Sequence, residues 1–532
     1  MSAQPATTTI PLTPKEDQLK ELLLDVARYV DQSQSAAEPV VLRWAGGWVR
    51  DKLLGIESHD IDTAINVMTG EAFALKICEL CEKPETIQKH RITETDVGNL
   101  HKIARNPDKS KHLETTTIKL FGYDVDFVNL RKETYTEDSR NPQMEFGTAE
   151  EDALRRDATV NALFFNLNTG QVEDFTTGLA DMKLKLIRTP LEPFQTFMDD
   201  PLRVLRLIRF ASRLEFVIDR AAEEVMGDHR VLDALRLKIS RERVGVEIEK
   251  MLKGNHPRRA LRYIDERGLY HTIFTDPSNT SFPSPDISNW ILAYNFVDIL
   301  RMTKTPGSIY DVLVRSDEAA YFAWALSAIA PFGPVDQPPH TGKGRPPPPY
   351  GTLAVREGIK APNKLSDVCT AAYNHREEIA SLKKTVLNKT LVLKTPLDME
   401  DRDKIGMAIR RWEARGGHWR LQVLYALLVE AMMEIPSILI QRGPPGSDEF
   451  LEGWQLFLDH LQELDVMEAP SLKRLIDGTQ LAKALGVKPG KWMAQALDVC
   501  VAWQLRHPEA TDPAGAVEEV DSKRDELGIP AR

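Results

Sequence analysis

Asp60 and Asp62 are separated by one residue in SHDIDTAIN, a segment whose composition is typical of a β-strand. Residues two apart on a strand point to the same face, so both carboxylates converge while Ile61 faces the core. Adjacent carboxylates repel each other unless a cation joins them, and hard oxygen ligands favour Mg²⁺ held together with substrate phosphates. The pair therefore indicates a magnesium-dependent phosphate site, with a solvated acidic strand face as the simpler alternative.

A glycine turn lies just upstream of this pair. Gly46 and Gly47 follow the β-rich run VVLRWA and precede a helical run that we expect to begin near Trp48. Glycines at such a turn let backbone N–H groups approach a phosphate chain, and the start of a helix favours its negative charge. Arg50 is placed to add a phosphate contact. Together, the turn and the carboxylate pair favour phosphate chemistry over a solvated face.

A third carboxylate usually helps to align the metal ions in two-metal phosphoryl transfer. Asp126, in the strand-like run YDVDFVNLR, is the best candidate, and Asp124 on the same face of that run is the alternative. The sequence therefore predicts two Mg²⁺ ions held by Asp60 and Asp62, with Asp126 as the third catalytic carboxylate.

Two further segments carry charged residues at spacings that suit a nucleotide. EEDALRRDATVNALFFN places Asp157 and Asn161 four residues apart, on one face of the helix that we expect there. MDDPLRVLRLIRFASR begins with Asp200 and Pro201, which suit a helix start. The apolar residues of that helix lie on one side, and its arginines lie on the other. These arginines are Arg203, Arg206, Arg209 and Arg213. A salt-bridged helix start and a solvated basic face are the alternatives.

The run G-G-x-V-R-D-x-L-L-G, followed by two aspartates around an apolar residue, resembles the active-site signature of the class II tRNA nucleotidyltransferases. These enzymes belong to the DNA polymerase β superfamily. The match is close over residues 40–262, and D-D-P-L-R-V-L-R-L-I-R-F-A-S-R looks eukaryotic, and fungal in particular. The resemblance implies template-independent addition of CCA to the 3′ end of tRNA, with CTP and ATP as substrates and release of pyrophosphate.

The resemblance also implies roles around the nucleotide. Asp157 would contact the ribose, Arg156 and Asn161 would serve the sugar and the triphosphate, and Arg206 and Arg209 would line the same pocket. Asp200 and Arg203 would form an amino-acid template. Cytosine and adenine both present an amino donor beside a ring-nitrogen acceptor, which a carboxylate and a guanidinium match.

Three more motifs resemble this family outside the nucleotide pocket. Asp174 and Gly178, in EDFTTGLADM, resemble the hinge between head and neck. Arg140, in DSRNP, falls in the flexible loop that influences the switch from C to A addition. Lys488 and Lys491, in K-P-G-K-W, resemble the tail that holds the tRNA elbow.

The elements that must position these residues predict an α+β fold. A polymerase β-like nucleotidyltransferase head with a β-sheet is followed by an all-α neck, body and tail. The predicted ranges are a tail and helix over 1–37, the catalytic head over 38–190, the base-selecting neck over 191–275, a body over 276–445 with a proline-rich insertion at 331–350, and a tRNA-binding tail over 446–532. The acidic stretch from His507 onward predicts a mobile end.

The charge balance does not exclude a nucleic-acid partner. The 532 residues include 68 basic and 79 acidic side chains, a net charge of −11, yet residues 230–262 carry ten basic and four acidic ones. Phosphate binding depends on such local charge, because salt screens distant charges. The four cysteines are too few for a disulfide scaffold. Cys78 and Cys81 lie in a helical run, so we expect two half-buried thiols there and no metal or redox site.

No apolar stretch is long enough to span a membrane, and the first residues lack the pattern of a signal or transit peptide. We expect a monomer in the cytoplasm, with a nuclear pool also compatible and a mitochondrial pool only through a longer isoform. Two other functions stay open. A poly(A) polymerase-type RNA-tailing enzyme shares the signature, although the neck and tail motifs argue against it. An inactive RNA-binding scaffold would have lost the metal pair, yet Asp60 and Asp62 are present.

Overall fold

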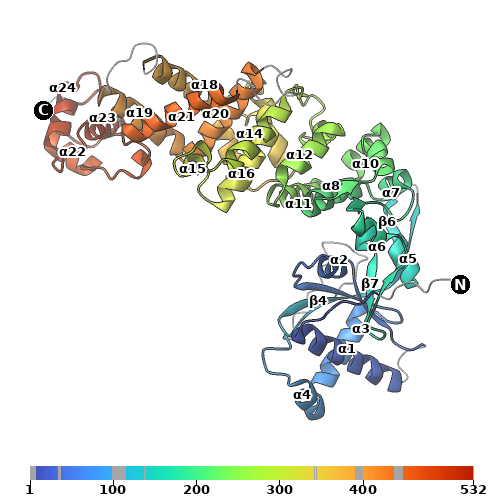
Figure 1. Cartoon of the computed structure of the whole chain (residues 1–532). Helices are drawn as coiled ribbons and strands as arrows, with labels where there is room; N and C mark the ends of the chain where they lie inside the picture. Colours follow the sequence, from blue (N-terminus) through green and yellow to red (C-terminus); the bar gives the residue numbers. More distant parts are fainter. Residues whose placement is uncertain are drawn as a thin grey trace. The chain divides into compact units, whose positions relative to one another are not determined.

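The computed structural model describes residues 8–33, 38–98, 116–136, 139–340, 342, 344, 346–389, 399–435 and 447–530 (Figure 1). For residues 134–144, 399–400 and 447–448 this description covers the backbone only. The chain divides into two compact units, Met1–Arg243 with Arg267–Thr272, and Val244–Glu266 with Ile273–Arg532. The boundaries predicted from the sequence are not tested by this division and stay predictions.

The first unit is built on a six-stranded sheet in the order β3-β4-β2-β1-β7-β8. Neighbouring strands pair antiparallel except β2 and β4, which run parallel. Outside this sheet lie the hairpin β5–β6 and the short parallel pair β9–β10. The strands are β1 (Leu42–Ala45), β2 (Asp60–Ile65), β3 (Thr116–Leu120), β4 (Tyr123–Asn129), β5 (Arg131–Thr136), β6 (Ser139–Phe146), β7 (Leu163–Asn166), β8 (Gln171–Asp174), β9 (Leu186–Ile187) and β10 (Val217–Ile218).

Alternation along β4 gives the sheet one buried and one open face. Val125 and Phe127 are fully buried, and the Phe127 ring packs against Phe73 of α3. Gly70, at the start of α3, is required by this packing, because a Cβ there would lie 2.1 Å from the Phe127 carbonyl oxygen. The helices of this unit are α1 (Pro14–Gln32), α2 (Gly47–Leu53), α3 (Gly70–Cys81), α4 (Pro84–His90), α5 (Ala149–Leu154), η2 (Thr159–Asn161), α6 (Gly178–Lys183), α7 (Pro193–Asp199), α8 (Leu202–Leu214), α9 (Arg220–Met226) and α10 (His229–Lys238).

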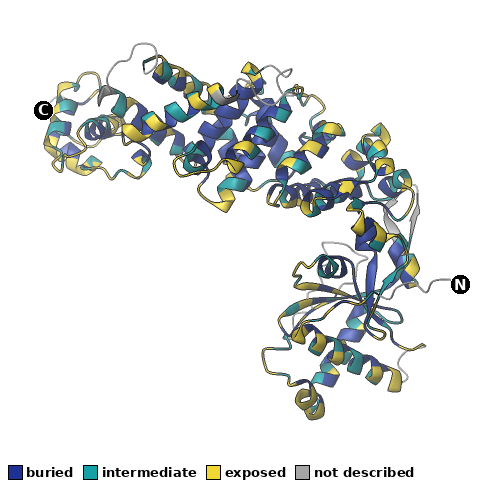
Figure 2. Ribbon diagram, in the orientation of Figure 1, coloured by how far each residue is buried: buried dark blue, intermediate teal, exposed yellow. Residues whose placement is uncertain are grey.

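The regular elements among the described residues of the second unit are all helices. Its core helix, α20, is apolar on nearly all sides and buries most of its length against α14, α16 and α18 (Figure 2). The helices are α12 (Pro257–Glu266), α14 (Trp290–Met302), α15 (Ile309–Leu313), α16 (Asp317–Ile329), η3 (Ala330–Phe332), α17 (Tyr350–Leu353), the π-helical turn η4 (Ala354–Gly358), α18 (Asn363–Leu387), α19 (Met399–Glu413), α20 (Trp419–Glu434), α21 (Ser447–Glu463), η7 (Ala469–Ser471), α22 (Gly478–Leu485), α23 (Met493–Arg506) and α24 (Ala514–Ser522). The division between the units falls within α11 (Arg241–Leu252) and α13 (Tyr270–Ile273).

The C-terminal stretch is ordered, so the predicted mobile end is wrong for the described residues up to Pro530. Ala516 and Val520 lie one turn apart on α24 and are buried, as is Ile529. They join the core that α22 and α23 form around Leu481 and Ala496. The high charge of this stretch concealed a narrow apolar stripe, which is enough to dock a short helix on a preformed partner.

The proline-rich insertion begins with a buried turn. Pro331 lies in η3 and is buried, whereas most described residues from 334 to 348 are exposed and have no regular structure before α17. Residues 341, 343 and 345 lie outside the described residues. None of the described helices is both long and apolar enough to cross a lipid bilayer.

Candidate active site

The carboxylates of β2 and β4 lie on one face of the sheet. The parallel register sets Asp60 beside Asp124 and Asp62 beside Asp126. Ile61 is buried, with 1% of its surface exposed, whereas Asp60 and Asp62 are open to solvent, as the strand pattern predicted. Neighbouring strands are about 4.8 Å apart, so these acids form one compact patch. Asp126 is the acid that the fold brings next to Asp62.

The negative charge of this patch is only partly compensated. Asp62 reaches solvent, but nearby protein atoms remove part of its hydration and raise its pKa. The charges of Asp126 and Asp60 raise the pKa of Asp62 further, against the opposing effect of the Arg156 guanidinium. The Thr117 hydroxyl on β3 donates a hydrogen bond to the Asp126 carboxylate and orients it. A cation is the group that would relieve this repulsion.

The donor set fits a hard divalent cation that keeps open coordination positions. In the part of the chain that the structure describes, no three or more His, Cys, Asp or Glu side chains form a group that could enclose a metal ion. Mg²⁺ does not need such an enclosure, because one or two carboxylates, substrate phosphates and water usually hold it. The patch around Asp62 therefore suits a metal that arrives with a phosphate-bearing substrate.

Strand β1 leads directly into the glycine turn. Gly46 has φ +68° and ψ −123°, a conformation that only glycine adopts without strain. A Cβ on Gly46 would lie 2.8 Å from a guanidinium nitrogen of Arg156 and 3.8 Å from a carboxylate oxygen of Asp62. Helix α2 begins at Gly47, one residue before the predicted start near Trp48, and a Cβ on Gly47 would lie 3.6 Å from Arg50, an ordinary contact. The backbone at Gly46 therefore lies close to both the Arg156 guanidinium and the Asp62 carboxylate.

Arg50 is engaged by protein side chains, and its predicted phosphate contact stays a prediction. It is 3% exposed, and its guanidinium donates to the Asp51 carboxylate at 2.8 Å and to the side-chain oxygen of Asn161. Burial lowers the pKa of Arg50, and the Asp51 charge opposes that shift. Asp51, which the sequence analysis missed, also accepts from Arg213 of α8 at 3.2 Å. The Arg-Asp pair of the glycine motif thus ties α2 to α8.

The single helix predicted through Asp157 and Asn161 is wrong. Helix α5 ends at Leu154, Ala158 is extended with φ −141°, and Asn161 closes the short 3₁₀ helix η2. The cause is a tertiary contact, because the Thr159 N–H donates to the Arg188 carbonyl oxygen at 2.8 Å instead of continuing the helix. Asp157 and Asn161 nevertheless meet, since the Asn161 amide donates to the Asp157 carboxylate at 3.1 Å.

Asp152 holds both arginines of this motif. Its carboxylate is 2% exposed and accepts from Arg155 at 2.9 Å and from Arg156 at 3.0 Å. Burial would raise the pKa of Asp152, but the two guanidinium groups lower it. Arg156 also donates to the Asn161 carbonyl oxygen at 3.1 Å, which fixes it beside Gly46. The sequence analysis missed Asp152, although its spacing of three and four residues to the arginines was a readable signal.

Asp157 is tied to α8. Arg206 donates to its carboxylate at 2.6 Å. Burial would raise the pKa of Asp157, but Arg206, Asn161 and Arg203 lower it to about 2, so the carboxylate is ionised at neutral pH. With 7% of its surface exposed, Asp157 is engaged by protein groups in this structure. A ribose contact stays a prediction.

Helix α8 is amphipathic as predicted. Val204, Leu207, Ile208 and Ala211 are buried, Arg206 and Arg209 are partly exposed, and Arg213 is exposed. Phe210, which the sequence analysis did not single out, gathers three guanidinium groups. Its ring centroid lies 5.6 Å from Arg50, 5.5 Å from Arg206 and 4.3 Å from Arg209. Such contacts hold cations at a partly buried surface.

Asp200 and Arg203 stand at the start of α8. The helix begins at Leu202, one residue later than predicted. The Asp200 carboxylate accepts from the Leu202 N–H at 3.3 Å and from the Arg243 guanidinium at 3.4 Å. Arg203, with 9% of its surface exposed, donates to the Arg155 carbonyl oxygen at 2.7 Å. The predicted N-cap position of Asp200 is wrong by one residue, because Pro201 is the N-cap, although the Asp200 carboxylate still accepts from the first N–H of α8. The template role of the pair stays a prediction.

Comparison with known proteins identifies the family. Residues 42–188 match the Poly A polymerase head domain, and residues 216–280 match the domain described as the probable RNA and SrmB-binding site of polymerase A. Nucleotidyltransferase lcsQ of Purpureocillium lilacinum is 55% identical over 98% of this chain and 93% of its own. The CCA tRNA nucleotidyltransferase, mitochondrial, of Saccharomyces cerevisiae is 38% identical over 94% of this chain and 92% of its own. The chain belongs to the tRNA nucleotidyltransferase family.

A solved structure supports the fold of this nucleotidyltransferase. The complex of a CCA-adding enzyme with CTP superposes with a TM-score of 0.62 at 18% identity, over 98% of this chain and 99% of the other. At this identity the likeness concerns the fold alone. It confirms the predicted α+β class, with a sheet-containing head followed by helices.

Asp174 and Gly178 fix the start of α6 in the nucleotidyltransferase. The Asp174 carboxylate accepts from the backbone N–H groups of Thr176 at 3.0 Å, Gly178 at 3.1 Å and Leu179 at 2.9 Å. A Cβ on Gly178 would lie 2.5 Å from the Thr159 carbonyl oxygen, so only glycine permits this close approach to η2. These contacts give the motif a physical basis that the sequence did not show. Its role as a hinge stays a prediction.

The remaining predicted residues take no part in the contacts described above. Lys488 and Lys491 are exposed in the loop between α22 and α23, beside the buried Trp492. Arg140 lies on β6, and its side chain is outside the described part of the structure, as is the segment 99–115. Cys78 and Cys81 are free, partly buried thiols on α3, as predicted, and burial raises the pKa of each to about 11.

Proposed function

We propose that this nucleotidyltransferase adds CCA to the 3′ end of tRNA without a nucleic-acid template, using CTP and ATP and releasing pyrophosphate. The observation that carries the proposal is the carboxylate patch of Asp60, Asp62 and Asp126 beside the glycine turn at Gly46. The name of the Saccharomyces cerevisiae relative and the CTP complex of a protein with the same fold support this substrate class.

Asp60, Asp62 and Asp126 are the residues that would hold two Mg²⁺ ions. Bound ions of this kind lower the pKa of an attacking hydroxyl and neutralise the charge of the leaving pyrophosphate. Gly46 lets the phosphate chain approach the backbone, because no side chain fills the space in front of Arg156. Arg156, held by Asp152 and the Asn161 carbonyl oxygen, presents a fixed positive charge on that side.

Base selection is assigned to Asp200 and Arg203. A base with an amino donor beside a ring-nitrogen acceptor would exchange for their present partners, the Leu202 N–H and the Arg155 carbonyl oxygen. Uracil and guanine present the reverse order and would leave both charged groups unpaired, which is costly in a site that excludes water. This asymmetry would admit C and A and reject U and G.

The proposal also covers partners and location. The exposed Lys488 and Lys491 would contact the phosphates of the tRNA elbow. The enzyme would act as a monomer in the cytoplasm, with a nuclear pool also compatible. The word "mitochondrial" in the name of the Saccharomyces cerevisiae relative favours a further pool in that organelle.

One product analysis tests the proposal. Purified full-length protein is incubated with a tRNA transcript that lacks its terminal CCA, together with CTP, ATP and Mg²⁺, and the 3′ ends are sequenced. The expected product ends in CCA. Oligo(A) ends would instead assign the RNA-tailing activity suggested by the match to the Poly A polymerase head domain. An unchanged end, with tRNA bound equally well without Mg²⁺ and nucleotides, would assign an inactive RNA-binding scaffold.

A further inference from the structure

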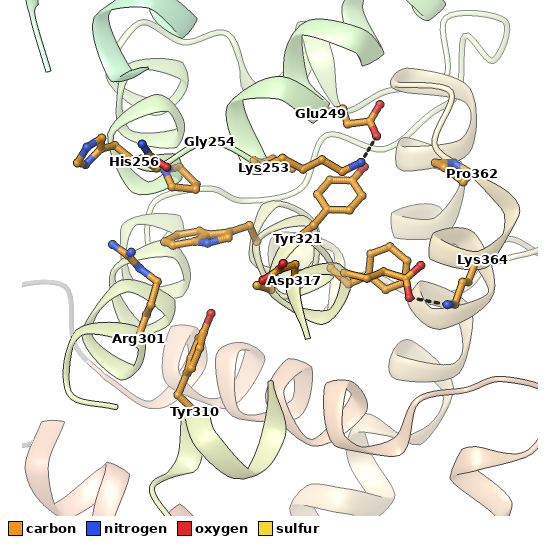
Figure 3. Close-up of a pocket in the computed structure, with 17 residues that line it drawn as sticks. Glu249, Lys253, Gly254, His256, Arg301, Tyr310, Asp317, Tyr321, Pro362 and Lys364 are labelled. Carbon is orange, nitrogen blue, oxygen red and sulfur yellow. Dashed lines mark hydrogen bonds and ion pairs between the residues drawn. The ribbon is translucent and has the colours of Figure 1, made fainter. Parts of the chain in front are cut away.

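The second unit contains a pocket of its own, with a volume of about 940 Å³ (Figure 3). Its walls come from the end of α11, the starts of α12, α16 and α18, and residues of α14 and α15. Small-ligand pockets in proteins typically measure roughly 300–1,000 Å³. No residue assigned to the carboxylate site lines this pocket.

The floor of the pocket is aromatic and carries polar atoms without partners. Tyr310, Tyr321 and Trp324 line it, and each is at most 6% exposed. Among the residues that the structure describes, no group accepts from or donates to their two hydroxyls or the indole N–H, and none of these atoms is sealed in the interior. Figure 3 shows the Tyr310 hydroxyl directed into the space between Arg301 and Asp317. Because these donors reach the pocket, a bound ligand can pair with them.

These hydroxyls keep their protons at neutral pH. Loss of hydration raises the pKa of Tyr310, against the opposing charge of Arg301. Loss of hydration and the Glu249 charge both raise the pKa of Tyr321. The floor therefore offers hydrogen-bond donors beside an apolar surface, which suits a flat ring that carries acceptor nitrogens or carbonyl oxygens.

Acidic and basic side chains balance on the rim, and the positive potential is concentrated at Arg301 and at two helix starts. The Lys253 ammonium lies 4.9 Å from the Tyr321 ring centroid and pairs with Glu249 at 2.6 Å, while Lys364 pairs with Glu318. Arg301 also lines the pocket and is exposed. It pairs at 2.9 Å with Asp298, which does not line the pocket. Helices α12 and α18 begin at the pocket without an acidic residue in the first turn, so their N-terminal N–H groups add positive potential.

We infer that this pocket binds one nucleotide unit. The base would pack on the aromatic floor and accept from the Trp324 indole and the tyrosine hydroxyls, because every base has a flat apolar face with acceptors at its edge. The phosphate would lie at Arg301 and the starts of α12 and α18. Asp317, in the first turn of α16, would accept from a base amino group or a ribose hydroxyl. The inference does not depend on the reaction proposed for the head.

A nucleotide unit can come from free nucleotide or from an RNA strand, and photolabelling distinguishes the two sources. Full-length protein is irradiated with 8-azidoadenosine 5′-monophosphate, or with a 4-thiouridine-containing tRNA transcript that lacks CCA, and labelled peptides are identified by mass spectrometry. We expect label on residues 301–324 from at least one probe. Label from the monophosphate assigns free nucleotide, and label from the transcript alone assigns an RNA strand. Absence of label there with both probes overturns the inference.

Two variants test the roles of the lining residues. Arg301→Gln should reduce the label in residues 301–324 about tenfold, because a charge-assisted hydrogen bond to phosphate is lost. Tyr310→Phe, which keeps the packing, should reduce it by a smaller factor. The matched control is Arg262→Gln, an exposed arginine that also pairs with an acid on its own helix but lies outside the pocket, and its label should not change. Labelling of both pocket variants at the level of the parent would overturn the inference, whether or not the protein adds CCA.

Discussion

Two groups of aspartates in the head have opposite surroundings. Asp152 and Asp157 are buried, each is paired with guanidinium groups, and their pKa values are lowered. Asp60, Asp62 and Asp126 share an open face of the sheet, and the pKa of Asp62 is raised. Aspartates that are paired with arginines of the same chain stabilise the fold. Aspartates that lie beside one another carry a negative charge that a bound ligand must balance. This difference separates scaffold from site more clearly than residue type does.

Removing Asp62 should have the largest effect on activity. Asp62→Ala deletes a carboxylate from the metal patch, so CTP incorporation should fall roughly a thousandfold or more. The fold should persist, because the lost charge is one that its neighbours repel. Radiolabelled CTP incorporation and thermal unfolding of the same preparations measure the two effects. Retained incorporation within tenfold of the parent would contradict the metal assignment.

A pair of variants on β4 refines this result. Asp126→Ala should also lose most of the activity, whereas Asp124→Ala, which removes the neighbouring acid two residues away on the same face, should lose less than tenfold. Similar losses in both variants would show that both acids serve the site, and a larger loss in Asp124→Ala would place the third carboxylate at Asp124.

Asp157 provides the opposite case, an effect on stability that depends on pH. The pKa of Asp157 is about 2 in the folded chain, below its ordinary value of 3.8. Its ionised form therefore stabilises the fold above pH 3.8, and this stability is lost as the pH falls through 2. Asp157→Asn should therefore cost about 2 kcal/mol at pH 7. The cost should shrink as the pH approaches 2. Urea unfolding of the parent and the variant at several pH values measures this cost. A cost independent of pH would show that the pairing of Arg206 with Asp157 does not stabilise the fold.

The glycine turn connects the two groups of acids. Gly46→Ala forces a side chain into a conformation reserved for glycine and against Arg156, so it should cost about 1–2 kcal/mol and displace the cation beside Asp62. Gly47→Ala is the matched control, because its Cβ would meet only an ordinary contact with Arg50. Thermal unfolding of both variants provides the comparison. Equal costs would mean that the close approach at Gly46 is not the constraint.

The smallest effect should come from replacing an exposed arginine at the edge of the network of paired aspartates and arginines. Arg213 is exposed and donates one hydrogen bond to Asp51. Arg213→Gln should cost only about 0.5 kcal/mol, since such pairs are well solvated. A double-mutant cycle with Asp51→Asn measures the coupling. A coupling above about 2 kcal/mol would show that Arg213 belongs with the buried scaffold.

The sequence could predict those features that repeat with the period of a strand or a helix. Alternation placed Asp60 and Asp62 on one face of β2, and the spacing of arginines against apolar residues placed α8 correctly. The glycine turn was also predictable, because a left-handed residue between strand and helix requires glycine.

The remaining features depend on contacts between distant parts of the chain. The end of α5 is set by Arg188, and the buried Arg50 guanidinium donates to Asn161, which is 111 residues away along the chain. Neither contact has a local pattern. The order of the C-terminal stretch likewise requires the core of α22 and α23 as a partner. Local periodicity identified the acids that a ligand needs, but it could not show which arginines the fold already uses.

The parallel pairing of β2 with β4 makes the site sensitive to the parity of insertions. A shift of β4 by one residue would turn Val125 or Phe127 toward the open face and remove the acid next to Asp62, since successive side chains alternate. A shift by two residues, about 6.6 Å along the strand, would replace Asp126 by Asp124 and restore a carboxylate at the same place. The site can therefore keep its chemistry after a two-residue insertion ahead of these acids. A one-residue change removes the carboxylate, as does a two-residue deletion, which would bring Val128 beside Asp62.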